Sequence, residues 1–583
     1  MTALWHTAPS AFGGSSGVWS VAAALVLLIP HTAAGEEGPM AELVLTGGRV
    51  VTMDERQPRA EAIALAGDRI QAVGSVRDIE RHIGARTRVI ELHDELVIPG
   101  FIESHGHFMS LGDSRMTLDL SSADSWEQCV TLVAEAAKKT PSGRWVVGNG
   151  WHQGKWSRAP RPSVEGYPTH AALSAVTPNN PVLLNHGTGH MVVANARAME
   201  LARVERRADS TGGEALRDAA GQLTGVFREN AADLIQAAYD RSLQGRSAAE
   251  VQQDRLTAAR LAVQECLANG VTSFQDAGSS FATVELYREL ARRGELQVRL
   301  WVMLNESNEA LERDLARYRT IGEADQHLTV RAVKRLIDGA IGTHGAWLLE
   351  PYNDLPGKSG LNTTSVESIR RSAEIALKHD CQLCVHAIGD RANRVVLDLF
   401  AEATRSRQRD ALRWRIEHAQ HLNPDDIPRF AQLGVIASMQ GVHATSDGPF
   451  VVARLGTERA RLGAYAWRSL LDHGARIANG TDVPVEPIRP IDCFAASVTR
   501  RMRNGERFFP EQCMTREEAL RSYTRDAAYA AFEEDLKGSL APGKLADLVV
   551  LSKDILSIPD DEIRTAEVTC TIIGGKIVWQ RQP

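Results

Sequence analysis

The chain has 583 residues, of which 43% are hydrophobic and 24% charged, with a formal net charge of −7. Its length predicts a large domain with at least one smaller one, and its acidic balance, without a Lys/Arg cluster, argues against nucleic acid as a partner. Seven cysteines without a framework spacing argue against a fold held together by disulfides.

The N-terminal region is compatible with two interpretations. Val18–Ile29 is a nearly unbroken apolar run with the length of a signal-peptide core, and small residues follow it at Thr32–Ala34. Residues 1–17, however, contain no Lys or Arg, which signal peptides normally carry at their start. We therefore predict either a leader over residues 1–35, with a periplasmic or secreted protein, or a cytoplasmic protein that begins at Met40. Neither interpretation leaves a membrane span in the mature chain.

Short strand patterns separated by turns occupy residues 41–97 and return near the C-terminus, in residues 534–583. Leu43–Leu45 and Arg49–Thr52 flank Gly47–Gly48, which predicts a hairpin. A small β-module of this kind cannot bury both of its faces alone, and chain termini often lie close in space. We therefore predict that the two terminal segments form one composite β-sandwich beside the main domain.

Between these ends the chain alternates strand and helix patterns, which is typical of an α/β fold with parallel strands. The strand patterns are the run that leads to His105, followed by residues 271–274, 297–304, 329–337, 382–386, 414–418, 435–439 and 476–478. Eight such strands predict a (β/α)8 TIM-type barrel over residues 98–533, with its active site at the C-terminal strand ends. Residues 112–245 are far longer than an ordinary loop. They predict an inserted α+β subdomain over the barrel mouth.

The first barrel strand ends in His105-Gly106-His107. Side chains two residues apart on a strand share one face, so both imidazoles project the same way and form half of a site for a divalent metal. Other strand ends carry Lys334 on the fourth strand, His386 on the fifth, His418 on the sixth and Asp482 on the eighth. Each histidine alone is more typical of a core position. Four of them with an aspartate at strand ends predict a metal site.

The motifs at these strand ends resemble those of the amidohydrolase superfamily of metal-dependent hydrolases. Within it they are most similar to the amidohydrolase-3 group of YtcJ-like proteins, which includes N-substituted formamide deformylase. The resemblance extends from about residue 41 to the C-terminus. It rests on Pro99–His107, Val333–Lys334, Asp338–Ala340, Val385–Ala392, Ile416–Gln420, Gly480–Pro484 and Gly538–Leu548.

The resemblance implies a set of metal ligands. They are His105, His107, Lys334, His386, His418 and Asp482. The first two and Asp482 would bind one ion and the other two histidines a second, with Lys334 between the ions as a carboxylated lysine. An ammonium cannot ligate a cation, whereas a carbamate supplies two anionic oxygens. One or two zinc ions are expected in such a site, although iron, manganese or cobalt would also suit nitrogen and oxygen ligands.

Further residues are expected to contact substrate. His190 in the inserted region and Gln440 and His443 after the seventh strand are the candidates. The alternative for His190 is a surface or capping role, and Gln440 and His443 have a non-functional role as their alternative. Glu417, beside His418, is expected to support a ligand rather than to act as an acid. His344 and Val483 depart from the family pattern and are expected near the pocket, so the substrate preference cannot be taken from a relative.

The predicted activity is hydrolysis of an amide or another non-peptide C–N bond in a small molecule of N-acyl or N-formyl type. Asp482 would take a proton from the attacking water and deliver it to the leaving nitrogen. A lyase or isomerase on the same metal site is one alternative, because a fold does not fix a reaction. A non-catalytic regulatory protein is another. The sequence leaves the assembly open, with a homodimer among the states that it allows.

Overall fold

The computed structural model describes residues 40–204, 212–405 and 409–582. The leader predicted over residues 1–35 lies outside these ranges. Within the ranges, no helix has both the length and the apolar character that crossing a membrane requires.

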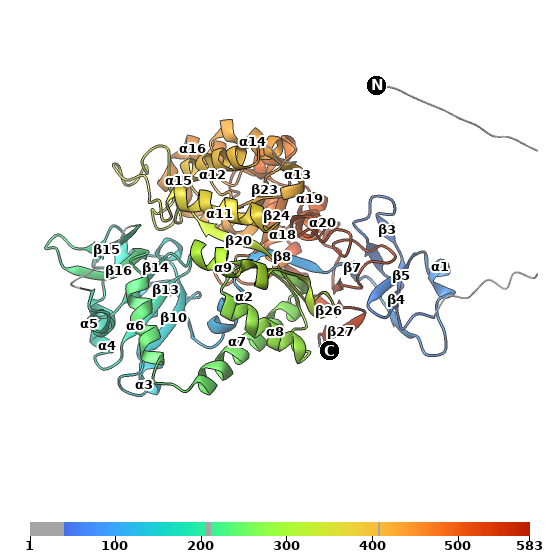
Figure 1. Ribbon diagram of the computed structural model, residues 1–583, viewed down its shortest axis with the longest axis horizontal. Coiled ribbons are helices and arrows are strands. Elements are labelled where there is room, and N and C mark those ends of the chain that lie inside the picture. The colour runs from blue at the N-terminus through green and yellow to red at the C-terminus, as the bar shows by residue number, and fades with distance from the viewer. Residues whose placement is uncertain (1–39, 205–211, 406–408, 583) are drawn as a thin grey trace, which may run out of the picture. The chain divides into compact units, whose positions relative to one another are not determined.

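Eight parallel strands form the centre of the fold (Figure 1). In sheet order they are β8 (Phe101–Gly106), β17 (Val271–Ser279), β18 (Arg299–Leu304), β20 (Leu328–Leu336), β21 (Gln382–Ala387), β22 (Arg415–His418), β23 (Ile436–Gln440) and β24 (Ile477–Gly480). All neighbouring pairs in this order are parallel. The predicted TIM-type α/β fold is therefore confirmed.

The first and last strands of this order, β8 and β24, meet just beyond the end of β24. The backbone N–H of Asp482 donates to the carbonyl oxygen of His105 (2.8 Å). The Glu103 carboxylate of β8 accepts from the backbone N–H of Thr481 (2.6 Å) and from its hydroxyl (3.0 Å). These bonds nearly close the barrel, and they bring Asp482 beside the histidines at the end of β8.

Helices in the intervals between the strands cover the barrel. They include α2 (Phe108–Ser114), α7 (Ala248–Ala268), α8 (Phe281–Arg292), α9 (Asn308–Tyr318), α11 (Val366–Lys378), α12 (Asp390–Ala403), α14 (Ile427–Leu433), α15 (Gly441–Leu455), α17 (Trp467–Asp472) and α18 (Pro490–Thr499). Helices α7, α8, α9 and α11 each begin after a serine whose side chain caps the first turn. Their apolar faces join the strands in one continuous hydrophobic cluster.

The long interval between β8 and β17 holds a second sheet with its own hydrophobic clusters. Its strands are β9 (Leu118–Asp119), β10 (Val146–Trp151), β13 (Val182–His186), β14 (Met191–Ala194), β15 (Gly213–Arg217) and β16 (Leu223–Glu229). Its helices are α3 (Trp126–Lys139), α4 (Ala171–Val176), α5 (Ala196–Ala202) and α6 (Asp233–Leu243). Strands β10 and β13 are parallel neighbours, so the segments that follow them leave from the same edge of the sheet.

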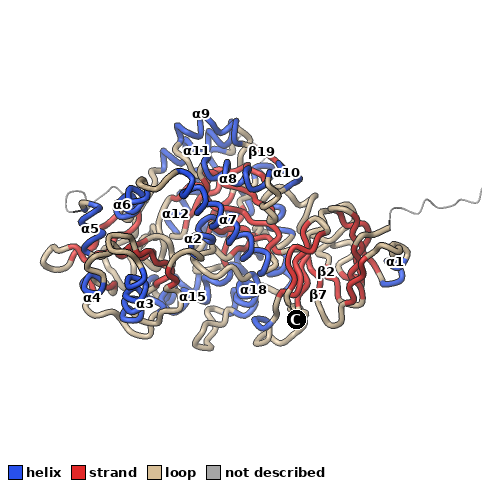
Figure 2. Tube along the Cα trace, turned by 90° about the horizontal axis from the view of Figure 1, so that it is seen from below, coloured by secondary structure: helices blue, strands red, loops and turns tan. Residues whose placement is uncertain are grey.

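Strands from both ends of the chain pair in one sheet, of order β27-β26-β25-β7-β2-β3 (Figure 2). Its strands are β2 (Arg49–Val51), β3 (Arg59–Ala60), β7 (Leu96–Pro99), β25 (Leu548–Leu551), β26 (Val568–Ile573) and β27 (Lys576–Gln580), with β25 and β7 antiparallel. A second sheet contains β1 (Leu43–Thr46), β4 (Ala62–Ala66), β5 (Arg69–Gly74) and β6 (Arg88–Glu91). Leu43 and Leu65 of this sheet share a hydrophobic cluster with Leu548 and Ile572 of the other.

The hairpin predicted around Gly47–Gly48 is wrong. Strand β1 pairs with β4 and β6, whereas β2 pairs with β3 and β7. Gly47 has a φ of +78°, and a Cβ on Gly48 would lie only 2.6 Å from Cβ of Leu92. The two glycines therefore carry the chain from one sheet to the other at a place where no side chain fits.

A buried ion pair joins the barrel to the C-terminal strands. Arg299, at the start of β18, bonds Asp547 through Nε–Oδ2 (2.7 Å) and Nη2–Oδ1 (2.9 Å), and the two side chains are 3% and 2% exposed. We expect Asp547→Ala to lower the free energy of unfolding by about 3–5 kcal/mol, because it leaves a buried guanidinium without its partner. Urea titration measures the change, with the exposed Asp68→Ala as the control. Equal stabilities of the two variants would contradict this role.

Candidate metal centre

Three of the predicted ligands surround the carboxylate of Asp482. The Nε2 atoms of His105 and His107 lie 3.6 Å and 3.2 Å from Asp482 Oδ1. His418 Nδ1 lies 3.9 Å from Oδ2. One ligand atom each from His105, His418 and Asp482 can be chosen so that all three lie within 4.8 Å of one another. Nitrogen and oxygen atoms gathered in this way suit a single divalent ion.

His386 and Lys334 extend the cluster from β21 and β20. The ring centroids of His386 and His418 are 4.6 Å apart, as are those of His105 and His418. Lys334 is 2% exposed, and its Nζ lies 3.4 Å from His105 Nε2. All six predicted metal ligands therefore meet at the C-terminal strand ends, while their binding of metal stays a prediction.

Burial sets the protonation of the cluster. It holds the pKa values of His105, His386 and His418 well below the ordinary imidazole value, so these rings are neutral and offer a lone pair at neutral pH. Burial opposes ionisation of Asp482, but the adjacent imidazoles of His107 and His105 outweigh it and keep the pKa of the carboxyl below its usual range. Neutral imidazoles around an ionised carboxylate are the protonation state that a cation requires.

Two buried polar atoms of the cluster have no hydrogen-bond partner at a suitable distance and angle among the described residues. Within the described ranges, His386 Nε2 and Asp482 Oδ1 are buried and form no well-directed hydrogen bond. Leaving a buried polar atom unpaired costs about 1–3 kcal/mol. Imidazole nitrogen and carboxylate oxygen are ligands that divalent transition metals accept. The residues present therefore fit a divalent metal ion.

Glu417 and Gln440 orient two of the histidines. Glu417 Oε2 contacts His105 Nδ1, and Gln440 Oε1 accepts a hydrogen bond from His418 Nδ1 (2.8 Å). Each acceptor places the ring proton on Nδ1, which leaves Nε2 with a free lone pair. Gln440 was expected to line the substrate pocket. It is instead 2% exposed, and it is not among the residues that line the two cavities at the cluster.

Arg415 holds Glu417 in this position, with Nε–Oε1 and Nη2–Oε2 distances of 2.7 Å and 3.1 Å. We expect Glu417→Gln to weaken metal affinity about 10–100-fold, because the neutral amide supports the proton on His105 Nδ1 less strongly. Competition with a chromogenic chelator measures the affinity. The exposed Glu367→Gln is the control. Unchanged affinity in Glu417→Gln would show that the contact does not act on the metal.

Sequence reasoning missed Glu229, which joins the insert to the barrel. Its Oε2 lies 2.8 Å from His190 Nδ1, and its Oε1 occupies the place where a Cβ on Gly339 or Gly345 would lie. This contact holds the His190 ring 5.1 Å from that of His386. Burial opposes protonation of His190, but the Glu229 carboxylate outweighs it and raises the pKa of the imidazole. The only sequence signal was the pair of glycines in the loop after β20.

Asp338 fixes the loops that follow β20 and β21. Its carboxylate accepts backbone N–H groups from Trp347 (2.8 Å), Ile388 (3.0 Å) and Gly389 (2.8 Å). Burial raises the pKa of this carboxyl to about 7 although these bonds oppose the shift. Asp338 Oδ1 lies 3.4 Å from His386 Nε2. Asp338 belongs to the Asp338–Ala340 motif on which the family resemblance rests. Its carboxylate therefore lies beside His386 and supports that ring.

Two cavities meet at the cluster, one of about 680 Å³ and one of about 30 Å³. Asp482, His190, His386 and His418 line both, and His443 lines the small one. His344, expected near the pocket, lies two residues beyond Gly342, which lines the small cavity, but itself lines neither cavity. Its Nε2 lies 3.2 Å from Asp354 Oδ1, and its ring packs on Tyr352.

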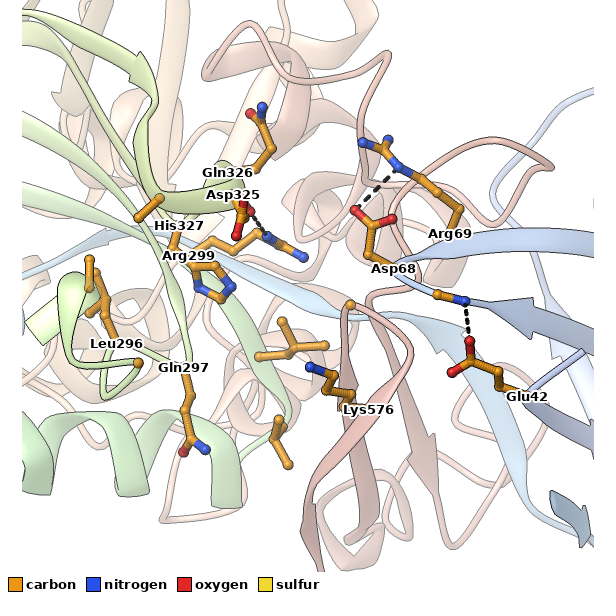
Figure 3. Close-up of a pocket in the computed structure, with 17 residues that line it drawn as sticks. Glu42, Asp68, Arg69, Leu296, Gln297, Arg299, Asp325, Gln326, His327 and Lys576 are labelled. Atoms are coloured by element: carbon orange, nitrogen blue, oxygen red, sulfur yellow. Dashed lines mark hydrogen bonds and ion pairs between the residues drawn. The ribbon is translucent and has the colours of Figure 1, made fainter. Parts of the chain in front are cut away.

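A larger crevice of about 910 Å³ lies at the opposite ends of the barrel strands (Figure 3). Its charged side chains are largely satisfied within the protein. Arg69 pairs with Asp68 (3.4 Å), and Arg299 pairs with Asp547 and donates to the carbonyl of Asp325 (3.1 Å). Across the described ranges, the single group of metal-ligating side chains is the one at His105, His418 and Asp482. The smaller cavities, rather than this crevice, are therefore the candidate functional site.

A TIM-type barrel with histidines and aspartate gathered at its C-terminal strand ends has the arrangement of a metal-dependent hydrolase. A family model described as the amidohydrolase family matches residues 88–579. The chain belongs to this family, and the predicted resemblance is confirmed.

Three relatives span nearly the whole chain. LONG AFTER FAR-RED 3 of Arabidopsis thaliana is 31% identical over 557 residues, which cover 93% of this chain and 92% of the relative. The putative amidohydrolase YtcJ of Bacillus subtilis is 29% identical over 545 residues, with coverages of 92% and 99%. N-substituted formamide deformylase of Arthrobacter pascens is 27% identical over 552 residues, with coverages of 93% and 99%.

Two solved structures share the fold. An uncharacterized metal-dependent hydrolase from Pyrococcus horikoshii has a TM-score of 0.70 and 25% identity, covering 89% of this chain and 99% of its own. One from Pyrococcus furiosus has a TM-score of 0.67 and 28% identity, with coverages of 88% and 100%. Family and neighbours together support a hydrolase.

Proposed function

We propose that this protein is a metal-dependent hydrolase that cleaves an amide or another non-peptide C–N bond in a small N-acyl or N-formyl substrate. The observation that carries the proposal is the meeting of six potential ligands at the junction of two cavities. They are His105, His107, Lys334, His386, His418 and Asp482. Similarity to a deformylase that acts on N-substituted formamides supports the choice of a C–N bond.

His105, His107 and Asp482 would hold one divalent ion, and His386 and His418 a second. Zinc suits this histidine-rich donor set, and iron, manganese and cobalt are accepted by the same ligands. The identity and number of the ions are part of the proposal.

Lys334 would bridge the two ions as a carbamate. Burial lowers the pKa of the amine, although Glu417 and Asp482 oppose the shift. A lowered pKa enlarges the neutral fraction, whose lone pair attacks carbon dioxide. A bond forms between Nζ and the carbon atom, one proton leaves, and the product carries a single negative charge on two oxygens. This product would place an anion between the histidines.

A divalent cation bound here would lower the pKa of water and polarise a carbonyl group. Asp482 lines both cavities, so its carboxylate can accept the proton of the attacking water and pass it to the leaving nitrogen. His190 is held by Glu229 through Nδ1, and this carboxylate favours the protonated ring. The protonated ring would donate from Nε2 to the carbonyl oxygen of the substrate. Both roles use groups that lie beside the junction of the cavities.

Several finer predictions remain proposals. The composite β-sandwich of residues 41–97 and 534–583 is supported by the pairing of β25 with β7. The barrel over residues 98–533 and the subdomain over residues 112–245 are supported by their separate sheets. N-terminal sequencing of the native protein distinguishes an exported protein with a leader over residues 1–35 from a cytoplasmic protein that starts at Met40. Light scattering tests for a homodimer.

A panel of N-formyl and N-acyl amines tests the proposed function. We expect metal-loaded protein to release primary amine from at least one member, chelation to stop the reaction, and added divalent metal to restore it. The released amine is measured with an amine-reactive fluorophore. A protein that holds its metal and hydrolyses no member of the panel would contradict the proposal.

A further inference from the structure

The two cavities at the cluster differ more than twentyfold in volume. The wide cavity measures about 680 Å³ and the small one about 30 Å³. Both are lined by His190, His386, His418 and Asp482. A carbonyl group held among these residues would therefore have one substituent directed to each cavity. The size of the small cavity then limits one half of the substrate.

His152 forms a wall of the small cavity. Its ring stacks on Phe450 with centroids 5.3 Å apart, and it lies 4.4 Å from the ring of His186. The wall is tightly packed, because a Cβ on Gly342 would lie 3.3 Å from His152 Nε2 and 3.5 Å from Phe450. A water-sized group needs about 10–15 Å³ of such space, so the cavity admits about two of them.

The lining of the small cavity is polar. Within the described ranges, His152 Nε2 and His443 Nε2 are buried without a hydrogen-bond partner, and the two residues are 4% and 6% exposed. Two carboxylates also line it. Asp447 Oδ2 accepts from Gln420 Nε2 (2.8 Å) and from the Tyr465 hydroxyl (2.7 Å), and Glu486 Oε1 accepts from Lys155 Nζ (2.7 Å).

An alkyl group in this cavity would leave the two imidazole nitrogens unpaired, whereas a short polar group can satisfy them. Burial keeps the pKa of His152 well below the ordinary imidazole value. Its Nδ1 accepts the backbone N–H of Gly154 (3.1 Å), so the proton is on Nε2. His152 Nε2, which is buried without a hydrogen-bond partner in the described part of the chain, is therefore a neutral donor in need of an acceptor.

The orientation of the substrate follows from the space that its acyl half and its amine half each require. A leaving amine must move away from the carbonyl carbon as the bond breaks, and a cavity of about 30 Å³ provides no such space. The acyl substituent stays attached to the carbonyl carbon throughout. The wide cavity can accommodate the departing amine.

We propose that the small cavity binds the acyl substituent, limits it to a short hydrogen-bonding group of about two non-hydrogen atoms, and uses His152 to set this limit. The substrates favoured are carbamoyl and hydroxyacetyl derivatives of an amine, with the amine half in the wide cavity. The inference rests on the proposed C–N hydrolase function and makes it more specific.

Acyl derivatives of one amine, 3-amino-1,2-propanediol, test the inference with metal-loaded protein. Hydroxyacetyl and propionyl groups are nearly isosteric and differ chiefly in polarity. Carbamoyl and acetyl groups are also isosteric, but the carbamoyl derivative is a urea with a less reactive carbonyl, so this pair is compared by binding. We expect kcat/KM to favour the hydroxyacetyl over the propionyl derivative about tenfold, and the carbamoyl derivative to bind about tenfold more tightly than the acetyl derivative. We expect the butyryl derivative to react about a hundredfold more slowly than the acetyl derivative. Equal rates across the series would overturn the inference. A size limit that appears when the amine is varied, but not when the acyl group is varied, would also overturn the inference.

His152→Ala removes the wall. We expect it to raise the butyryl-to-acetyl ratio of kcat/KM about tenfold, while the exposed His473→Ala leaves this ratio at the wild-type value. An unchanged ratio in folded His152→Ala would overturn the role of this residue, and the wild-type series decides the size limit even if the variant does not fold.

Calorimetric titration of the same derivatives separates this inference from the proposed function. If no derivative is hydrolysed but the polar and short ones bind most tightly, the hydrolase proposal fails and the cavity assignment stands. If they bind without regard to size or polarity, the cavity assignment fails.

Discussion

Asp482→Asn is expected to reduce kcat/KM by about three orders of magnitude at equal metal occupancy. The carboxylate lies 3.2 Å from His107 Nε2 and 3.6 Å from His105 Nε2, and it lines both cavities. An amide has nearly the same shape but cannot take up and return a proton. It also lacks the negative charge that a cation attracts, so metal content must be measured together with the rate.

The exposed Asp68→Asn provides the matched control, because it makes the same chemical change in a side chain that is 59% exposed. Steady-state kinetics on the best substrate of the amide panel measure both variants. Wild-type turnover by Asp482→Asn with its metal in place would remove Asp482 from the mechanism.

Lys334→Ala is expected to lose at least half of the bound metal and to reduce kcat about a hundredfold or more. The side chain is 2% exposed, and its Nζ lies 3.4 Å from His105 Nε2. Without this lysine no carbamate can form between the two groups of histidines. The exposed Lys138→Ala controls for the loss of a lysine elsewhere.

Metal analysis and carbon-13 NMR of protein equilibrated with labelled carbon dioxide measure the two parts of this prediction. Wild-type protein should show a carbamate signal that Lys334→Ala lacks. Full metal content and full activity in Lys334→Ala would exclude a bridging role.

The barrel and the meeting of the six potential ligands could be predicted from sequence for a physical reason. Parallel strands that alternate with helices bring their C-terminal ends to one edge. His105 and His418 are therefore expected to be neighbours although they are far apart in the chain. In the structure their ring centroids are 4.6 Å apart. The residues at the C-terminal strand ends therefore predict the cluster.

Contacts that depend on packing between separate elements could not be predicted in this way. Gly47–Gly48 has the local signature of a hairpin, but the approach of Leu92 sends the strands into different sheets. Glu229 reaches the site only because the insert docks on glycines of the loop after β20. Gln440 follows a barrel strand, and its side chain turns to His418.

The small cavity was hidden from sequence reasoning for the same reason. His152 of the insert lines it together with Gly342, and Phe450 packs behind His152; Gly342 and Phe450 follow different barrel strands. None of the three belongs to a motif quoted for the family resemblance, so the proposed size limit on the substrate rests on the fold alone.

The metal content of the purified protein tests the proposed site most directly. After expression with excess zinc, iron, manganese or cobalt and purification without chelator, elemental analysis should find about one to two equivalents of a divalent transition metal per chain. Most of this metal should be lost when His105 and His107 are both replaced by alanine. Protein that is folded but contains no transition metal after this treatment would contradict the proposed site.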